Sequence, residues 1–235
     1  SGIEGKKIGI ITEMIGDGID PEVLTATKEA ISKLEGLGAV CEEVSLDMVK
    51  YSVAAYYTIT ATEAGSNLAR YDNLRYGYDF PVEGYEFNSY ISKARKNLGP
   101  EVTRRMIIGG FVPSAGHAGK YFLKAMKVKS KLTKEINEAF KKFDLLIAPT
   151  VPIMPFKIGE KIDDPVSLFL VDINTVTANL TGKPAISIPF KIVNGLPIGI
   201  QLLANSMNDK LLLKAAYALE QTVTLPEVPI WPKSV

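Results

Sequence analysis

The sequence opens on a short apolar segment, a helical pattern and a second short apolar segment, and this order limits the fold more than any other feature. Lys7–Ile11 is predicted to be a buried strand. Asp20-Pro21 predicts the start of a helix, because aspartate is a good N-cap and proline suits the first helical position. Gly36 and Gly38 predict its end, and Ala39–Leu46 predicts the second strand. A β-α-β opening of this kind favours an α/β fold.

Helices and strands continue to alternate after this opening, which predicts a β-sheet core covered by helices. Met48–Tyr71 is predicted to be mostly helical, and Pro100 predicts the start of another helix. Apolar residues at helical spacing over Phe122–Phe143 predict a long helix whose other face carries lysines. Asp209 predicts the cap of a last helix that reaches Val223. The remaining apolar runs predict three buried strands, at Leu145–Ala148, Ala185–Pro189 and Ile198–Leu203.

The chain is predicted to form one domain. With 235 residues, 46% of them hydrophobic, it is long enough to bury a sizeable core. No segment has the composition of a good linker, so residues 6–225 are assigned to a single domain. Residues 1–5 are interpreted as a flexible start or a remnant of cloning, and residues 226–235 as a proline-rich tail on the surface.

Charge and cysteine content exclude several classes of protein. The 27 lysines and arginines nearly balance the 26 aspartates and glutamates, which excludes a protein whose whole surface grips nucleic acid. The lysines of the 120–142 helix are therefore favoured as a solvated face over an RNA contact. The single cysteine, Cys41, permits no disulfide within the chain and indicates a reducing compartment such as the cytoplasm. No apolar run is long enough to span a membrane, so no membrane contact is expected.

The residues alone give weak signals for chemistry. Gly16–Pro21 follows a strand and opens a helix, as a dinucleotide-binding loop would, but Pro21 replaces the third glycine and a plain turn is favoured. His117, the only histidine, is favoured as a solvated or capping residue over a catalytic one. Cys41 in a strand is favoured as a buried, unreactive thiol. The acidic pair Asp163-Asp164 is favoured as a turn or cap in the loop before Pro165, so no metal site is predicted.

Several segments taken together carry a resemblance to a known family. One of them is Asn179–Ser187, which reads Asn-Leu-Thr-Gly-Lys-Pro-Ala-Ile-Ser. The others, in chain order, are Ala61–Tyr78, Leu98–Arg105, Ser114–Gly116, Ala148–Thr150, Phe156–Glu160, Asp163–Pro165 and Gly195–Gln201. Their order and spacing resemble the amidase-signature family over about Lys6 to Val223. Within that family, Glu63–Tyr78 is similar to the A subunits of glutamyl-tRNA(Gln)/aspartyl-tRNA(Asn) amidotransferases.

The resemblance implies that this chain is the C-terminal part of the amidase-signature fold, a mixed β-sheet covered by helices. The family's nucleophile is a serine in a Gly/Ser-rich signature, helped by a second serine and an upstream lysine, and no such run occurs here. The chain is therefore expected to hold no catalytic residue and to be inactive alone. Five residues depart from the family's usual pattern, namely Gly65, Asn73, His117-Ala118 and Thr177, where serine, glycine, an aromatic pair and proline are common.

The resemblance also implies a substrate and partners. The full enzyme would hydrolyse glutamine to supply ammonia that converts Glu-tRNA(Gln) to Gln-tRNA(Gln), or Asp-tRNA(Asn) to Asn-tRNA(Asn). By motif position, Arg105 would bind the α-carboxylate of glutamine, Asp172 its α-ammonium, and Tyr56 would be a pocket aromatic. The expected partners are the missing N-terminal half and the B and C subunits of a heterotrimer, with tRNA contacted mainly through them. ATP and magnesium would belong to the partner that binds tRNA, and no cofactor is expected in this chain.

Two other functions remain open at this point. The chain could be a fragment of another amidase-signature hydrolase, although a hydrolase of hydrophobic amides has no need of the charged pair Arg105 and Asp172. It could also be a short, non-catalytic interaction module with polar docking surfaces. A truncated chain instead predicts an exposed apolar patch or association between chains, because its apolar strands need cover on both faces.

Overall fold

The structure is a computed structural model that describes residues 2–71, 76, 83–114, 116, 120–160 and 171–225 of the chain. Its residues group into two compact units, one made of Ser1–Val53 and Ser130–Val235 and the other of Ala54–Lys129. The boundaries fall inside two helices, so the chain passes between the units without a separate linker. The assignment of residues 6–225 to a single domain stays a prediction.

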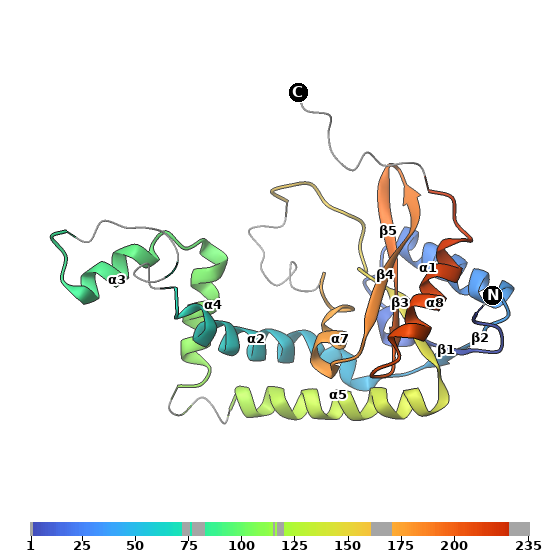
Figure 1. The fold of residues 1–235 in the computed structure, drawn as a ribbon, viewed down its shortest axis with the longest axis horizontal. Coiled ribbons are helices and arrows are strands. Elements are labelled where there is room, and N and C mark those ends of the chain that lie inside the picture. The colour runs from blue at the N-terminus through green and yellow to red at the C-terminus, as the bar shows by residue number, and fades with distance from the viewer. Residues whose placement is uncertain are drawn as a thin grey trace. The chain divides into compact units, whose positions relative to one another are not determined.

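The first unit contains a five-stranded mixed sheet (Figure 1). Its strand order is β2 (Val40–Val44), β1 (Lys7–Ile11), β3 (Leu145–Pro149), β5 (Leu196–Ala204) and β4 (Ala185–Val193). β1 pairs in parallel with β2 and β3, whereas β5 pairs antiparallel with β3 and β4. The predicted α/β class with a mixed sheet is therefore confirmed, and so are all five predicted strands.

Two helices of the first unit pack on one face of this sheet, α1 (Pro21–Gly36) and α8 (Asp209–Glu220) (Figure 1). Their buried side chains form one core with the sheet, and those from the helices are Val23, Ala26, Ala30, Leu34, Leu212, Ala215, Ala216 and Leu219. All five residues of β3 are buried, as expected for a central strand. The start of α1 at Pro21, after Asp20, is confirmed.

The prediction for the last helix is partly wrong. Asn208 occupies the N-cap position of α8, and Asp209 is its first helical residue. The carboxylate of Asp209 thus lies in the first turn, where it favours the helix through the macrodipole rather than as a cap. The helix ends at Glu220 instead of Val223, because the chain turns there.

Short helices complete the first unit. Thr12–Met14 (η1) directly follows β1, Asp47–Tyr51 (η2) follows β2, and Val176–Thr181 (α7) precedes β4. The residues around η1, the segment after β3 and the turn before α7 are the parts of this unit that build the site below.

The second unit is helical in its described residues. It contains most of α2 (Ser52–Leu68), all of α3 (Phe87–Arg95) and α4 (Pro100–Phe111), and the beginning of α5 (Phe122–Lys142). α2 and α4 approach so closely that a Cβ built on Gly109 would lie 2.2 Å from the Ala61 carbonyl oxygen. A Cβ on Gly65 would likewise lie 3.0 Å from the Cα of Gly109. Within the described ranges, no helix is long and apolar enough to cross a membrane.

The predicted long helix is confirmed as α5. Its apolar stripe is buried from Ala125 onward, through Leu132, Ile136, Ala139 and Phe140. Two exposed lysines near its end form ion pairs with carboxylates, Lys141 with Glu138 at 2.8 Å and Lys142 with Glu42 at 2.7 Å. Such pairs are typical of a solvent-exposed helix face, and the choice of a solvated face over an RNA contact stays a prediction.

Candidate functional site

Two loops of the first unit are joined where β1 and β3 end. The backbone N–H of Asp20 donates to the carbonyl oxygen of Pro152 at 2.9 Å. The carboxylate of Asp20 accepts from the backbone N–H of Met154 at 2.7 Å. Asp20 therefore holds the loop after β3 instead of capping its own helix, and no side-chain cap bond is present at that helix. Because both strands run parallel, their carboxyl ends lie at the same edge of the sheet, where α/β folds commonly bind ligands.

A third segment reaches the same edge, the turn that leads into α7. The carbonyl oxygen of Asp172 accepts hydrogen bonds from the N–H groups of Thr175 and Val176, at 2.9 and 3.0 Å. It also accepts one from the Thr175 hydroxyl at 3.0 Å. Thr175 is the N-cap residue of α7, so Asp172 shapes the turn through its backbone and does not occupy the cap position itself.

This turn is tied to the sheet by two buried amide side chains. Asn174 is 1% exposed, and its Nδ2 donates to the Pro149 carbonyl oxygen at the end of β3 at 3.0 Å. Gln201 on β5 is 3% exposed, and its Nε2 donates to the Asn174 carbonyl oxygen at 3.0 Å. Gln201 belongs to a family motif but was given no role from the sequence, and Asn174 was missed. The available signal was a polar amide within an otherwise apolar strand.

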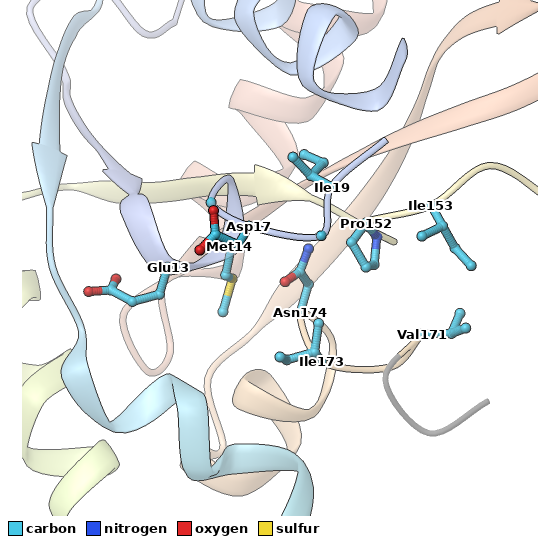
Figure 2. Close-up of a pocket in the computed structure, with 11 residues that line it drawn as sticks. Glu13, Met14, Asp17, Ile19, Pro152, Ile153, Val171, Ile173 and Asn174 are labelled. Carbon is cyan, nitrogen blue, oxygen red and sulfur yellow. The ribbon is translucent and has the colours of Figure 1, made fainter. Parts of the chain in front are cut away.

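The three segments enclose a cavity of about 270 Å³ (Figure 2). Its polar side chains are Glu13, Asp17 and Asn174, and its apolar wall comes from Met14, Ile19, Pro152, Ile153, Val171 and Ile173. Val171 and Ile173 are the two neighbours of Asp172 in the chain. The turn that carries Asp172 is thus one wall of a partly open, acidic hollow.

Glu13 is held in place at the edge of this cavity. Its carboxylate accepts from the backbone N–H of Leu46 at 2.9 Å, from the Thr12 hydroxyl at 3.2 Å and from the hydroxyl of Ser45. Burial favours the neutral form of the carboxyl, but the bonds from Ser45 and Leu46 outweigh burial and lower the pKa of Glu13. The residue is therefore a fixed negative charge that ties η1 to the chain after β2.

A second cavity of about 420 Å³ lies next to the first and shares Ile153 and Val171 with it. Its wall is mostly apolar, but the hydroxyls of Thr150 and Ser187 meet in it at 2.7 Å. A Cβ on Gly199 would lie 2.9 Å from the Ser187 hydroxyl and 3.0 Å from that of Thr150. Only glycine leaves room for this hydroxyl pair.

The residues that the resemblance implied as substrate ligands are divided between the units. Asp172 belongs to the first unit, whereas Arg105 on α4 and Tyr56 on α2 belong to the second. The side chain of Arg105 is 40% exposed, and its Nε donates to Glu101 at 2.8 Å. The half-buried Tyr56 ring meets the ring of Tyr57 edge-on at 5.2 Å. The convergence of the three residues on one ligand belongs to the proposal below.

The remaining sequence candidates give no catalytic group in the described residues. Cys41 lies in β2 as predicted and is half-buried; burial, and after it the charge of Glu35, raise its pKa to about 11. Such a thiol is unreactive at neutral pH, because the thiolate is the nucleophile. Gly16–Ile19 forms a turn that lines the first cavity, and its interpretation as a plain turn stays a prediction. His117 and Asp163-Asp164 lie outside the described residues, within which no cluster of metal ligands occurs.

Comparison with known proteins shows which family has this sequence and fold. The model of the family described as Amidase matches residues 3–213. A relative from Cenarchaeum symbiosum, named as the A subunit of glutamyl-tRNA(Gln) amidotransferase, is 63% identical over 231 residues, which are 98% of this chain and 48% of that protein. A protein of the same name from Methanosarcina mazei is 46% identical over 93% of this chain and 46% of its own length. The chain thus spans about half the length of the curated relatives it matches.

Solved structures agree with this result. The crystal structure of the glutamyl-tRNA(Gln) amidotransferase A subunit from Thermotoga maritima matches with a TM-score of 0.68 and 36% identity, over 94% of this chain and 43% of that one. A bacterial aryl acylamidase of the amidase-signature enzymes matches with a TM-score of 0.72 over 94% of this chain and 44% of that one, but at 21% identity it shows the fold alone. With a family model that covers most of its length, the chain belongs to the amidase family.

Proposed function

We propose that this chain is the C-terminal half of the glutamine-hydrolysing component of an amidotransferase, and that it supplies ligands for glutamine but not the nucleophile. The observation that carries the proposal is the 63% identity, over 98% of the chain, to a protein named as the A subunit of glutamyl-tRNA(Gln) amidotransferase. In the complete enzyme, the ammonia released from glutamine would convert Glu-tRNA(Gln) to Gln-tRNA(Gln), or Asp-tRNA(Asn) to Asn-tRNA(Asn).

The chemistry of free glutamine supports the choice of ligands. The α-carboxylate needs paired donors, which a guanidinium offers in a fixed fork, and Arg105 is partly exposed on α4. The α-ammonium needs a carboxylate, and Asp172 lies on a turn that is anchored to the sheet. Tyr56 would cover the apolar stem of the substrate. Glu101 accepts a hydrogen bond from Nε of Arg105 and so orients the guanidinium. In this proposal, the two terminal nitrogens of Arg105 bind the substrate carboxylate.

The catalytic step belongs to the other half of the enzyme in this proposal. A serine of the family signature would attack the side-chain amide, release ammonia and leave a glutamyl ester that water then clears. The B and C subunits would complete a heterotrimer, and the partner that binds the tRNA would use ATP and magnesium. The cytoplasm is the proposed location, because the relatives are named for a tRNA reaction and the chain has a single cysteine.

Ammonia release from glutamine tests the proposal directly. We expect none from this chain alone and recovery of activity when the N-terminal half of the enzyme is added. Activity from the chain alone would place a nucleophile within it and refute the assignment of halves. If the mixture of halves released no ammonia while the full-length enzyme did, the two separate halves would have failed to assemble, and the assignment of catalytic residues would be unaffected.

The role of Arg105 has a matched control on the same helix. In the full-length enzyme, Arg105→Gln should lower kcat/KM for glutamine about a hundredfold, since it leaves the substrate carboxylate without a charged partner. Arg104→Gln removes a neighbouring arginine that also pairs with Glu101 and should change kcat/KM little. Equal losses in the two variants would assign both arginines to the fold of α4 instead.

A further inference from the structure

We infer that Asn174 and Gln201 are positioning residues that fix the Asp172 carboxylate for the substrate ammonium. The inference rests on the proposed role of Asp172 and adds two residues that do not touch the substrate themselves. What carries it is a chain of two hydrogen bonds that runs from the side chain of Gln201 to the backbone of the turn, and from the side chain of Asn174 to the end of β3.

The burial of both amides indicates that these bonds define the position of the turn. Asn174 and Gln201 are 1% and 3% exposed, so water cannot replace a partner that either amide loses. A buried polar group without a partner is destabilising, and the turn is therefore held where both donors are satisfied. The two anchors lie on strands that pair with each other, Pro149 on β3 and Gln201 on β5.

The bonds within the turn fix its shape, and the two amides fix its place. The Asp172 carbonyl binds Thr175 and Val176, which makes residues 172–176 a closed, local unit. Because Asn174 lies in the middle of that unit, a shift of Asn174 moves Asp172 with it. Asp172 is two residues from Asn174, at most about 7 Å along the chain, so little flexibility separates them.

A misplaced carboxylate affects one substrate and not another, which makes the inference testable. Glutaramate is glutamine without its α-amino group, so its hydrolysis does not use a contact to Asp172. In the full-length enzyme, the ratio of kcat/KM for glutamine to kcat/KM for glutaramate therefore reports the ammonium contact alone. Asp172→Asn should lower this ratio strongly and leave the rate with glutaramate nearly unchanged.

The positioning residues should lower the same ratio. We expect Gln201→Met and Asn174→Leu, which keep the side-chain volume and remove the donor, each to lower it about tenfold, the size of one lost buried hydrogen bond. Combined with Asp172→Asn, neither should lower it further, because the contact that they position is already gone. Thr27→Val is the matched control: it removes a buried bond to the Val23 carbonyl in the core of the same unit and should leave the ratio unchanged.

Three outcomes separate the possibilities. An unchanged ratio in Gln201→Met and Asn174→Leu, with a lowered ratio in Asp172→Asn, would overturn the inference and keep the proposed function. Equal losses for both substrates would show general damage to the fold and would also overturn it. An unchanged ratio in Asp172→Asn would remove the ammonium role from Asp172 and the inference with it.

A milder variant covers the case in which these two fail to fold. Gln201→Glu keeps the shape of the side chain, and a buried carboxyl donates a hydrogen bond only while it is protonated. The ratio should then approach that of the wild type at low pH and fall as the pH rises. A ratio that follows the pH profile of the unsubstituted enzyme would contradict the positioning role.

Discussion

Thr177 is fully buried at the start of α7, and its hydroxyl has no hydrogen-bond partner among the described residues. A buried hydroxyl without a partner costs roughly 1–3 kcal/mol of stability. Thr177→Val keeps the shape and removes the hydroxyl, so it should raise the free energy of unfolding by about 1 kcal/mol in urea denaturation.

Thr181 on the same helix serves as the control. Its hydroxyl donates to the Thr177 carbonyl at 2.7 Å, so Thr181→Val should lower stability by roughly 1 kcal/mol. If both valine variants were stabilising, the effect would come from helix or core packing rather than from the unpartnered hydroxyl.

Asp144 joins the starts of β1 and β3. Its carboxylate accepts from Lys6 Nζ at 3.0 Å and from the backbone N–H of Lys7 at 2.9 Å. Burial raises the pKa of this carboxyl, but the bonds from Lys7 and Lys6 outweigh burial and leave the pKa lowered. A lowered pKa means that the folded state binds the proton less readily than the unfolded chain does.

The sign of the pH dependence follows from this. The contribution of Asp144 is present above the unfolded pKa of about 4 and is lost as the pH falls through the lower, folded value. Asp144→Asn should destabilise the chain by about 1 kcal/mol at pH 7, a modest figure because the pair is partly exposed. The difference from wild type should shrink toward about pH 3 in denaturation measured at each pH. A difference that stays constant with pH would assign the effect to shape instead of charge.

At the scale of elements, the crossing of α2 and α4 depends on one glycine. A Cβ on Gly109 would meet the Ala61 carbonyl at 2.2 Å, so Gly109→Ala must push the helices apart. We expect a loss of about 1–3 kcal/mol, as for other overpacked sites, although alanine is the better helix former. Gly110 is its neighbour on the same helix and has nothing within 4 Å of a built Cβ. Gly110→Ala should therefore stabilise by about 0.5–1 kcal/mol, and equal effects of the two substitutions would argue against the close crossing.

The elements also show what a sequence can and cannot predict. β3 follows from an unbroken apolar run and the stripe of α5 from apolar residues at helical spacing, because their burial is encoded in their own residues. α3 was not predicted, since its nine residues, Phe87–Arg95, bury only Tyr90 and Ala94. At the site, motif position predicts Asp172, but it does not predict the hydrogen bonds that attach the turn of Asp172 to the sheet. The bond between Gln201 and residue 174 joins positions 27 residues apart, and only the folded chain brings them together.

At the scale of the whole chain, the surface of the second unit carries apolar side chains that a monomer in water usually covers. The most exposed of these on α4 and α5 are Ile107, Leu123 and Phe111, at 67%, 55% and 51%. Basic residues are interspersed with them on α5, which limits the patch without removing it. β4 lies at one edge of the sheet in the part of the first unit that the structure describes, and an edge strand can pair with another chain.

These surfaces predict that the chain alone associates or binds hydrophobic probes. We expect light scattering after gel filtration to give a mass above that of one chain, 25.6 kDa, or a monomer that enhances the fluorescence of anilinonaphthalene sulfonate. Phe111→Ser combined with Leu123→Lys should reduce the association or the probe fluorescence if the apolar surface of the second unit causes it. Association through the edge strand β4 would not change in this double variant, so the variant separates the two causes. Adding the N-terminal half should suppress the signal if that half covers these surfaces. A monomer that binds no probe would contradict the proposal that the other half of the enzyme covers these surfaces.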